Sequence, residues 1–109
     1  MEYIKIAQTE DLPVGSKQKI SLKGRDILLV NIEDHYYAID NTCTHMGGSL
    51  VDGNLDGFNI VCPKHGSAFD VRTGKVAGAG KLFFVKVKVT DLHAYPLKIE
   101  GSDILAGIE

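Results

Sequence analysis

Short alternations of apolar and polar residues run along most of the chain, and they predict strands rather than helices. Residues 17–22 alternate side-chain type, as in a strand with one buried face. Residues 27–32 are almost continuously apolar, which indicates a strand in the middle of a sheet. Further strands are expected at 3–7, 35–39, 58–61, 68–71, 81–89, 95–99 and 104–108. No amphipathic helix of three turns is expected.

Turn-forming residues separate these segments and set the fold class. Glycine contributes 12 of the 109 residues, above the average near 7%. Glu33-Asp34 is placed to close a hairpin, and residues 72–75 form another expected turn. Short strands joined in this way indicate an all-β fold, either a sandwich or a partly open barrel. A chain of 109 residues fits one domain, residues 1–109.

The charge balance excludes several classes of partner. Lys and Arg number 12 and Asp and Glu number 14, so the net charge is −2. Proteins that bind nucleic acid or anionic membranes show a basic excess, so neither partner is expected. No apolar run approaches the roughly 20 residues of a membrane helix, and no signal peptide is visible at the start. We therefore expect a cytoplasmic protein.

The two cysteines, Cys43 and Cys62, each have a histidine close by. The first pair is Cys43-Thr44-His45 and the second is Cys62-Pro63-Lys64-His65, with 16 residues between His45 and Cys62. A reducing cytoplasm makes a disulfide the less expected use of these thiols. All four side chains fall in expected loops, flanked by Gly47, Gly48 and Gly66. Glycines let a backbone approach an ion or cluster closely.

Three interpretations of this pattern compete. The thiols could be small buried hydrophobic groups beside surface histidines, but this pattern uses every cysteine of the chain. Two thiolates and two imidazoles could hold zinc, although zinc sites usually leave two to four residues between paired ligands and the first pair leaves one. The third interpretation is a two-iron cluster, in which two cysteines hold one iron and two histidines hold the other. Each loop then supplies one ligand to each iron.

The residues around both pairs resemble the Rieske iron–sulfur proteins, and specifically their soluble ferredoxins. The resemblance spans about residues 27–78 and is carried by residues 40–50, by Gly53 and Gly57, and by residues 62–70 and 73–76. It implies one [2Fe–2S] cluster per chain, an antiparallel β-sandwich or partly open barrel, and a small cluster-binding subdomain of two loops at about residues 40–72. The implied ligands are Cys43 and Cys62 on one iron and His45 and His65 on the other, with Ser67, Gly47 and Gly66 around the cluster.

The function implied by the resemblance is one-electron transfer rather than catalysis. The electron donor would be a flavin-dependent reductase, and the acceptor would be an oxygenase or another redox enzyme. No nucleophile–base motif is visible, so we do not expect an enzyme. One alternative is a small electron-transfer subunit of a larger oxidoreductase, similar to a nitrite-reductase small subunit. The other is a zinc-stapled interaction module.

Two departures from the respiratory members of the family predict a low reduction potential. Those proteins tie the two loops with a disulfide, at positions that correspond here to Gly48 and Lys64. They also carry a tyrosine where this chain has Phe69, which has no hydroxyl to donate to a cysteine sulfur. Ser67 is retained and could donate to a bridging sulfide. Because donors near sulfur stabilise the reduced cluster, the loss of one lowers the potential.

A third departure affects the region beside the cluster. The family has a proline-containing loop soon after the turn at residues 73–76, whereas this chain continues with Ala77-Gly78-Ala79-Gly80. We therefore expect an insertion at about residues 79–90. It would change the shielding of the cluster and the shape of the surface that partners meet.

Overall fold

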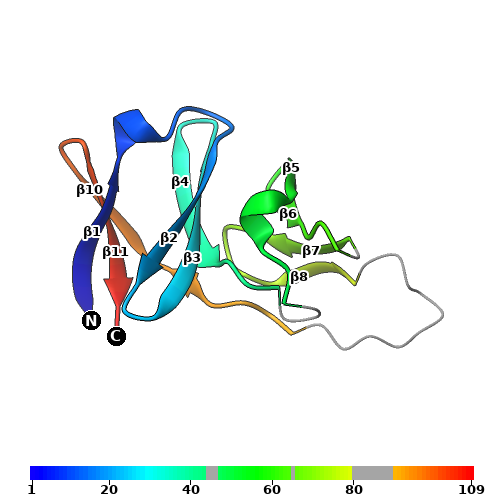
Figure 1. Cartoon of the computed structure of the whole chain (residues 1–109). Helices are drawn as coiled ribbons and strands as arrows, with labels where there is room; N and C mark the ends of the chain where they lie inside the picture. Colours follow the sequence, from blue (N-terminus) through cyan, green and yellow to red (C-terminus); the bar gives the residue numbers. More distant parts are fainter. Residues whose placement is uncertain (44–46, 65, 80–89) are drawn as a thin grey trace.

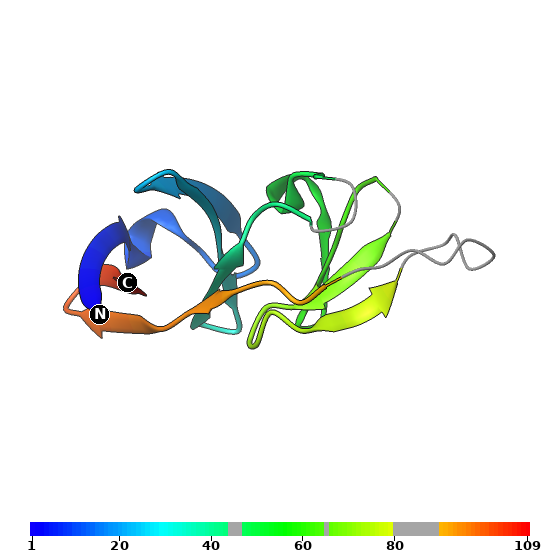
Figure 2. The same cartoon turned by 90° about the horizontal axis from the view of Figure 1, so that it is seen from below.

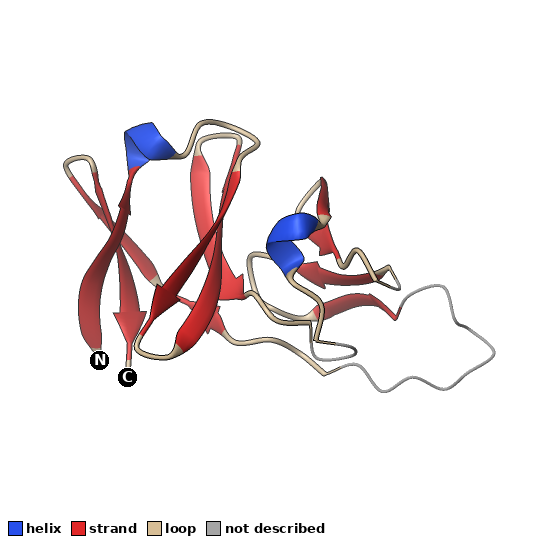
Figure 3. Cartoon of the chain, viewed as in Figure 1, coloured by secondary structure: helices blue, strands red, loops and turns tan. Residues whose placement is uncertain are grey.

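The computed structural model describes residues 1–43, 47–64, 66–79 and 90–109 as an all-β protein. Its described strands form three antiparallel sheets, and the described helical segments are two short 3₁₀ turns, η1 (Thr9–Asp11) and η2 (Leu50–Asp52) (Figure 3). The predicted all-β class is therefore confirmed. The expected strand at 81–89 lies outside the described residues. No helix in the described part of the chain is long and apolar enough to cross a membrane.

The first two sheets face each other and form what we call the large lobe (Figures 1 and 2). The first sheet has the order β1-β11-β10, with β1 (Glu2–Gln8), β11 (Asp103–Ile108) and β10 (Leu97–Glu100). The second has the order β2-β3-β4-β9, with β2 (Lys17–Leu22), β3 (Arg25–Ile32), β4 (His35–Asp40) and β9 (Ala94–Tyr95).

The third sheet lies to one side and forms the small lobe together with η2 and two loops (Figure 1). Its order is β5-β6-β7-β8, with β5 (Asn54–Asp56), β6 (Asn59–Val61), β7 (Ser67–Asp70) and β8 (Val76–Ala79). We call residues 42–49 loop 1 and residues 62–67 loop 2. Loop 1 follows β4 at the junction of the lobes, and loop 2 connects β6 to β7.

Strand β3 is buried on both faces, which explains its continuous apolar sequence. Leu28 and Val30 belong to one buried cluster, and Ile27 and Leu29 belong to another. Successive side chains of a strand point to opposite faces, so β3 contributes alternately to the two cores. The first core lies toward the small lobe, and the second lies between the two sheets of the large lobe. The predicted central strand is therefore confirmed.

The predicted turn at Glu33-Asp34 is also confirmed. The pairing Ile32↔His35 leaves a two-residue connection, and Glu33 and Asp34 have φ values of 55° and 67°. Such positive angles at both central residues match the twist of a hairpin. The Asp34 N–H donates to the Asn31 side-chain oxygen at 3.0 Å, which supports this unusual backbone.

Hydrogen bonds join the two lobes directly and through the returning segment at residues 90–93. Lys17 Nζ donates to the Gly53 carbonyl at 2.7 Å, and the Asp40 N–H donates to the His93 carbonyl at 3.0 Å. On the returning segment, the Leu92 N–H donates to the Gly74 carbonyl at 2.7 Å, and the Val76 N–H donates to Asp91 Oδ1 at 2.9 Å. These contacts place loop 1 at the junction of the lobes.

The C-terminal strands differ from the prediction. Residues 95–99 were expected to form one strand, but Pro96 divides the segment into β9 and β10. Proline has no N–H to continue the sheet, and here its carbonyl accepts from the Gly107 N–H at 2.8 Å. The chain therefore moves from the second sheet to the first at this point. Strands β5 and β8 were not predicted from the sequence.

Candidate metal centre

Loops 1 and 2 share one backbone hydrogen-bond pattern around their cysteines. The Cys43 N–H donates to the Gly48 carbonyl at 2.8 Å, and the Cys43 carbonyl accepts from the Gly47 N–H at 2.9 Å. In loop 2, the Cys62 N–H donates to the Ser67 carbonyl at 2.7 Å, and the Cys62 carbonyl accepts from the Gly66 N–H at 3.1 Å. Each cysteine thus opens a turn of the same size.

The glycine of each turn has a left-handed backbone. Gly47 has φ 69° and Gly66 has φ 79°, a region that side-chain-bearing residues rarely adopt. Both glycines were predicted to surround the cluster, and the structure gives them this equivalent place in the two loops. The Ser67 side chain is fully buried at the start of β7.

The two cysteine side chains are buried in the same core, and no disulfide joins them. Cys43 is 2% exposed and Cys62 is 3% exposed, and both belong to the cluster that includes Phe69 and Leu50. Soft thiolates select zinc, Cu(I) or iron–sulfur clusters. A pair of thiols in matching turns therefore fits a thiolate-held metal ion or cluster.

Gly48 brings loop 1 into close contact with loop 2. A Cβ atom added at Gly48 would lie 2.8 Å from Cys62 Sγ and 3.3 Å from Lys64 Cγ. Positions 48 and 64 are therefore neighbours, in agreement with their assignment as the pair that is bridged by a disulfide in respiratory proteins. A side chain at position 48 would displace the Cys62 sulfur or the Lys64 stem.

The structure describes part of the predicted site. Cys43, Cys62 and the three surrounding residues lie in the two loops, as expected. His45 and His65, the predicted histidine ligands, lie outside the described residues. Among the described residues, no group of three or more acidic, cysteine or histidine side chains could hold a metal ion.

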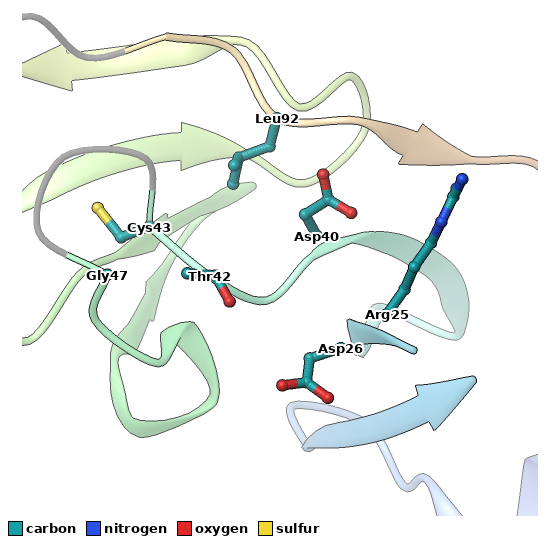
Figure 4. A pocket seen from close by; sticks show the side chains of 7 residues that line it. All are labelled: Arg25, Asp26, Asp40, Thr42, Cys43, Gly47 and Leu92. Carbon is teal, nitrogen blue, oxygen red and sulfur yellow. The ribbon is translucent and has the colours of Figure 1, made fainter. Parts of the chain in front are cut away.

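A cleft of about 520 Å³ lies beside loop 1, at the junction of the lobes. In Figure 4 the Cys43 sulfur lies on one side of Thr42, and the charged side chains of Arg25, Asp26 and Asp40 lie on the other. The Tyr95 hydroxyl donates to Asp40 Oδ1 at 2.5 Å. Burial raises the pKa of Tyr95, and the hydrogen bond to Asp40 raises it further, so the hydroxyl keeps its proton at neutral pH.

Sequence reasoning did not single out Asn41, which is 2% exposed and directly precedes loop 1. Its side chain accepts a hydrogen bond from the Val51 N–H and donates one to Ser49 Oγ. Asparagine is common in exposed turns, so its identity alone gave no signal that this one is buried. Its role depends on contacts that only the folded chain shows.

Comparisons with known proteins identify the family. A family model described as the Rieske [2Fe-2S] domain matches residues 2–87. The ferredoxin component of naphthalene 1,2-dioxygenase/salicylate 5-hydroxylase systems of a Ralstonia species is 35% identical over 107 residues, which cover 98% of this chain and 96% of that protein.

Two solved structures agree with this match. The ferredoxin of carbazole 1,9a-dioxygenase from Nocardioides aromaticivorans IC177 is 27% identical, with a TM-score of 0.86 over 100% of both chains. A chain from the complex of reduced oxygenase and oxidised ferredoxin in carbazole 1,9a-dioxygenase is 28% identical, with a TM-score of 0.81 over 95% of this chain and 91% of that one. This chain belongs to the Rieske [2Fe-2S] domain family.

Proposed function

We propose that this chain is the ferredoxin component of a ring-hydroxylating dioxygenase system and carries single electrons from a flavin-dependent reductase to the oxygenase. The observation that carries the proposal is the match, over almost the full length of both chains, to ferredoxin components of such systems. The cofactor is a Rieske [2Fe–2S] cluster, which stores and releases one electron. In this role the protein is an electron carrier and not itself a catalyst.

The proposed ligands are Cys43 and Cys62 on one iron, with His45 and His65 on the other. Support comes from the two buried thiols in turns with the same hydrogen-bond pattern. Ser67, Gly47 and Gly66 shape these turns around the cluster. Because imidazoles are neutral and thiolates are negative, an iron held by His45 and His65 would be the poorer in electrons and would take the added electron.

The potential is proposed to lie at the low end of the range of about −150 to +300 mV known for Rieske centres. Phe69 is fully buried in the core that contains both thiols, and it offers no hydroxyl to their sulfurs. Gly48 and Lys64 are neighbours that cannot form a disulfide. A midpoint well above about +100 mV, within that range, would contradict this part of the proposal.

The proposal also includes a place in the cell and a division of the domain. We expect a cytoplasmic protein whose partners are redox proteins, with no nucleic acid or membrane among them. Within a single domain of residues 1–109, residues 40–72 form the cluster-binding part. An insertion at about residues 79–90 would shape the surface that the redox partners meet.

The ferredoxin is favoured over the two alternatives. A small subunit of a larger oxidoreductase, such as nitrite reductase, would purify with its large subunit, whereas a ferredoxin purifies alone. A zinc-stapled module would hold stoichiometric zinc and would be colourless.

The decisive experiment is a reductive titration of the purified protein followed by electron paramagnetic resonance. We expect a rhombic signal with an average g value below that of all-cysteine clusters, and one electron taken up per chain. The reduced protein should then pass its electron to an added ring-hydroxylating oxygenase. A reduced sample that gives no electron paramagnetic resonance signal and contains zinc but no iron would overturn the proposal.

A further inference from the structure

Asn41 makes hydrogen bonds with all four of its polar groups at the base of loop 1. Its N–H donates to the Asp26 carbonyl of β3 at 2.9 Å, and its carbonyl accepts from the Leu50 N–H at 2.8 Å. Its side-chain Oδ1 accepts from the Val51 N–H at 2.9 Å, and its Nδ2 donates to Ser49 Oγ at 2.8 Å. The residue therefore joins the large lobe to both ends of loop 1.

The orientation of the Asn41 amide is determined by its partners. The Val51 N–H can only donate, so it must face the oxygen of the side chain. The nitrogen then faces the Ser49 hydroxyl. With Thr42 and Ser49 paired as an isolated β-bridge, this side chain closes the loop where the two arms meet.

Closure of the loop at Asn41 bears directly on both thiols. Cys43 lies two residues after Asn41, and its N–H donates to the Gly48 carbonyl next to Ser49. Gly48 in turn packs so closely against Cys62 Sγ that an added Cβ would lie 2.8 Å from it. Contacts thus run from the Asn41 amide through Ser49 and Gly48 to the sulfur of the opposite loop.

We propose that Asn41 is a positioning residue of the cluster: by closing loop 1, its amide sets where Cys43 lies relative to Cys62. The proposal rests on the proposed function, because it assumes that the two thiols hold a [2Fe–2S] cluster. Asn41 itself is not assigned as a ligand. Its effect acts through the backbone of loop 1.

The chain offers a matched control in Asn31, a second buried asparagine in the large lobe. Asn31 is 1% exposed, and its Nδ2 donates to the Leu12 carbonyl at 2.7 Å while its Oδ1 accepts from the Asp34 N–H at 3.0 Å. Its backbone also donates to Ser16 and accepts from Gly15. The two asparagines therefore match in burial and in hydrogen bonds, but only Asn41 adjoins a loop with a cysteine.

The test compares Asn41→Ala with Asn31→Ala in the protein that carries its cluster. Asn41→Ala leaves the Val51 N–H without its acceptor, and Asn31→Ala does the same to the Asp34 N–H, so both should lower the urea midpoint of unfolding by similar amounts. Only Asn41→Ala should change the g values and the midpoint potential of the cluster. It should also lose its visible absorption about tenfold faster under air, the factor expected from losing the side-chain hydrogen bonds of Asn41.

A third variant, Asn41→Asp, separates loop closure from other effects. The carboxylate can still accept from the Val51 N–H, and the Ser49 hydroxyl can turn to donate to it. We expect cluster retention to recover toward that of the wild type, while the potential falls because a negative charge disfavours the reduced cluster. If Asn41 only stabilised the fold, Asn41→Asp would not both retain the cluster and lower its potential.

The proposal is overturned if Asn41→Ala and Asn31→Ala have the same g values, potential and rate of cluster loss. It is also overturned if Asn41→Asp loses its cluster as fast as Asn41→Ala. Failure of the proposed function would look different, because the wild-type protein would then contain no [2Fe–2S] cluster to compare.

Discussion

Loops 1 and 2 present their cysteines in the same way but are held in place by different means. In both, the cysteine N–H and carbonyl close a turn that ends at a glycine with a left-handed backbone. Loop 2 connects two neighbouring strands, and the pair Val61↔Ala68 closes it directly. Loop 1 connects β4 to η2 across the junction of the lobes, and a buried side chain, Asn41, closes it.

This difference indicates that two cysteines in equivalent turns can have local support in one loop and non-local support in the other. Loop 2 obtains its shape from a hairpin whose strands are adjacent in the sequence. Loop 1 obtains its shape from a side chain whose backbone is anchored to the large lobe. Changes in the large lobe should therefore reach the cluster through loop 1, and loop 2 should respond mainly to changes within the small lobe.

The largest expected effect comes from removing a ligand from either loop. We expect Cys43→Ser, Cys62→Ser, His45→Ala and His65→Ala each to abolish the red-brown cluster, because every proposed ligand is needed to hold two irons. Iron and sulfide analysis with visible spectroscopy measures this loss. The control is His35→Ala, at an exposed histidine on β4, which should retain full iron content. A variant in the ligand set that keeps its rhombic signal would contradict the assignment.

The next largest effect is expected where the loops touch. Gly48→Ala places a Cβ 2.8 Å from Cys62 Sγ, so loop 1 should be pushed from loop 2. Overpacking of this kind costs roughly 1–3 kcal/mol, and we expect a shifted g tensor and faster cluster loss.

A matched control for this change lies in the same lobe. Gly78→Ala adds a Cβ at an ordinary 3.8 Å from the Ala68 Cβ, so its cluster should behave as in the wild type. Equal spectra for Gly48→Ala and Gly78→Ala would show that the close contact between the loops has no effect on the cluster.

A smaller effect is expected from a hydroxyl group added to Phe69, in the core that contains both thiols. Phe69→Tyr should raise the midpoint potential, because a hydroxyl donor near sulfur stabilises the reduced cluster. The rise should be about 60 mV, which corresponds to a tenfold change for a one-electron couple. Protein-film voltammetry measures it, and Phe58→Tyr, at a partly exposed ring that contacts Tyr37 by its edge, is the control. An unchanged or lower potential would argue against the explanation given for a low value.

The smallest effect concerns an ion pair at the far end of β7. The side-chain hydrogen bond from Arg72 lowers the pKa of Asp70 below its usual value of 3.8. The stability that this gives is therefore present above that pH and is lost as the pH falls through the lowered value. Because the pair is partly exposed to solvent, Asp70→Asn should reduce the free energy of unfolding by less than about 1 kcal/mol.

Urea titrations measure this difference at several pH values. It should stay constant from about pH 7 to 5 and shrink only below about pH 4. Cluster spectra should be the same as those of the wild type, because the pair closes the turn at the end of the hairpin that is away from loop 2. A difference that grows on acidification would contradict the sign of the shift.

Much of the fold could be predicted because it depends on local patterns. The alternation in residues 17–22 predicted β2 with its observed bounds, and the residue pair Glu33-Asp34 predicted the two-residue hairpin between β3 and β4. The spacing of each cysteine and histidine predicted a metal centre as one of three interpretations, and the resemblance of the surrounding residues to Rieske proteins indicated the family. The positions of β5 and β8 could not be predicted, since short strands of polar or small residues have no distinct pattern.

The sequence by itself determined the strand periodicity, the turns and, through the resemblance of both cysteine–histidine segments to Rieske proteins, the kind of cofactor, because each depends on residues that are close along the chain. Only the tertiary structure decided that Asn41 closes loop 1, that Gly48 rests against Cys62, and that β3 serves two cores. These features depend on which faces of distant segments meet. The side-chain amide of Asn41 and the absence of a Cβ at Gly48 matter only because the fold places distant segments beside them.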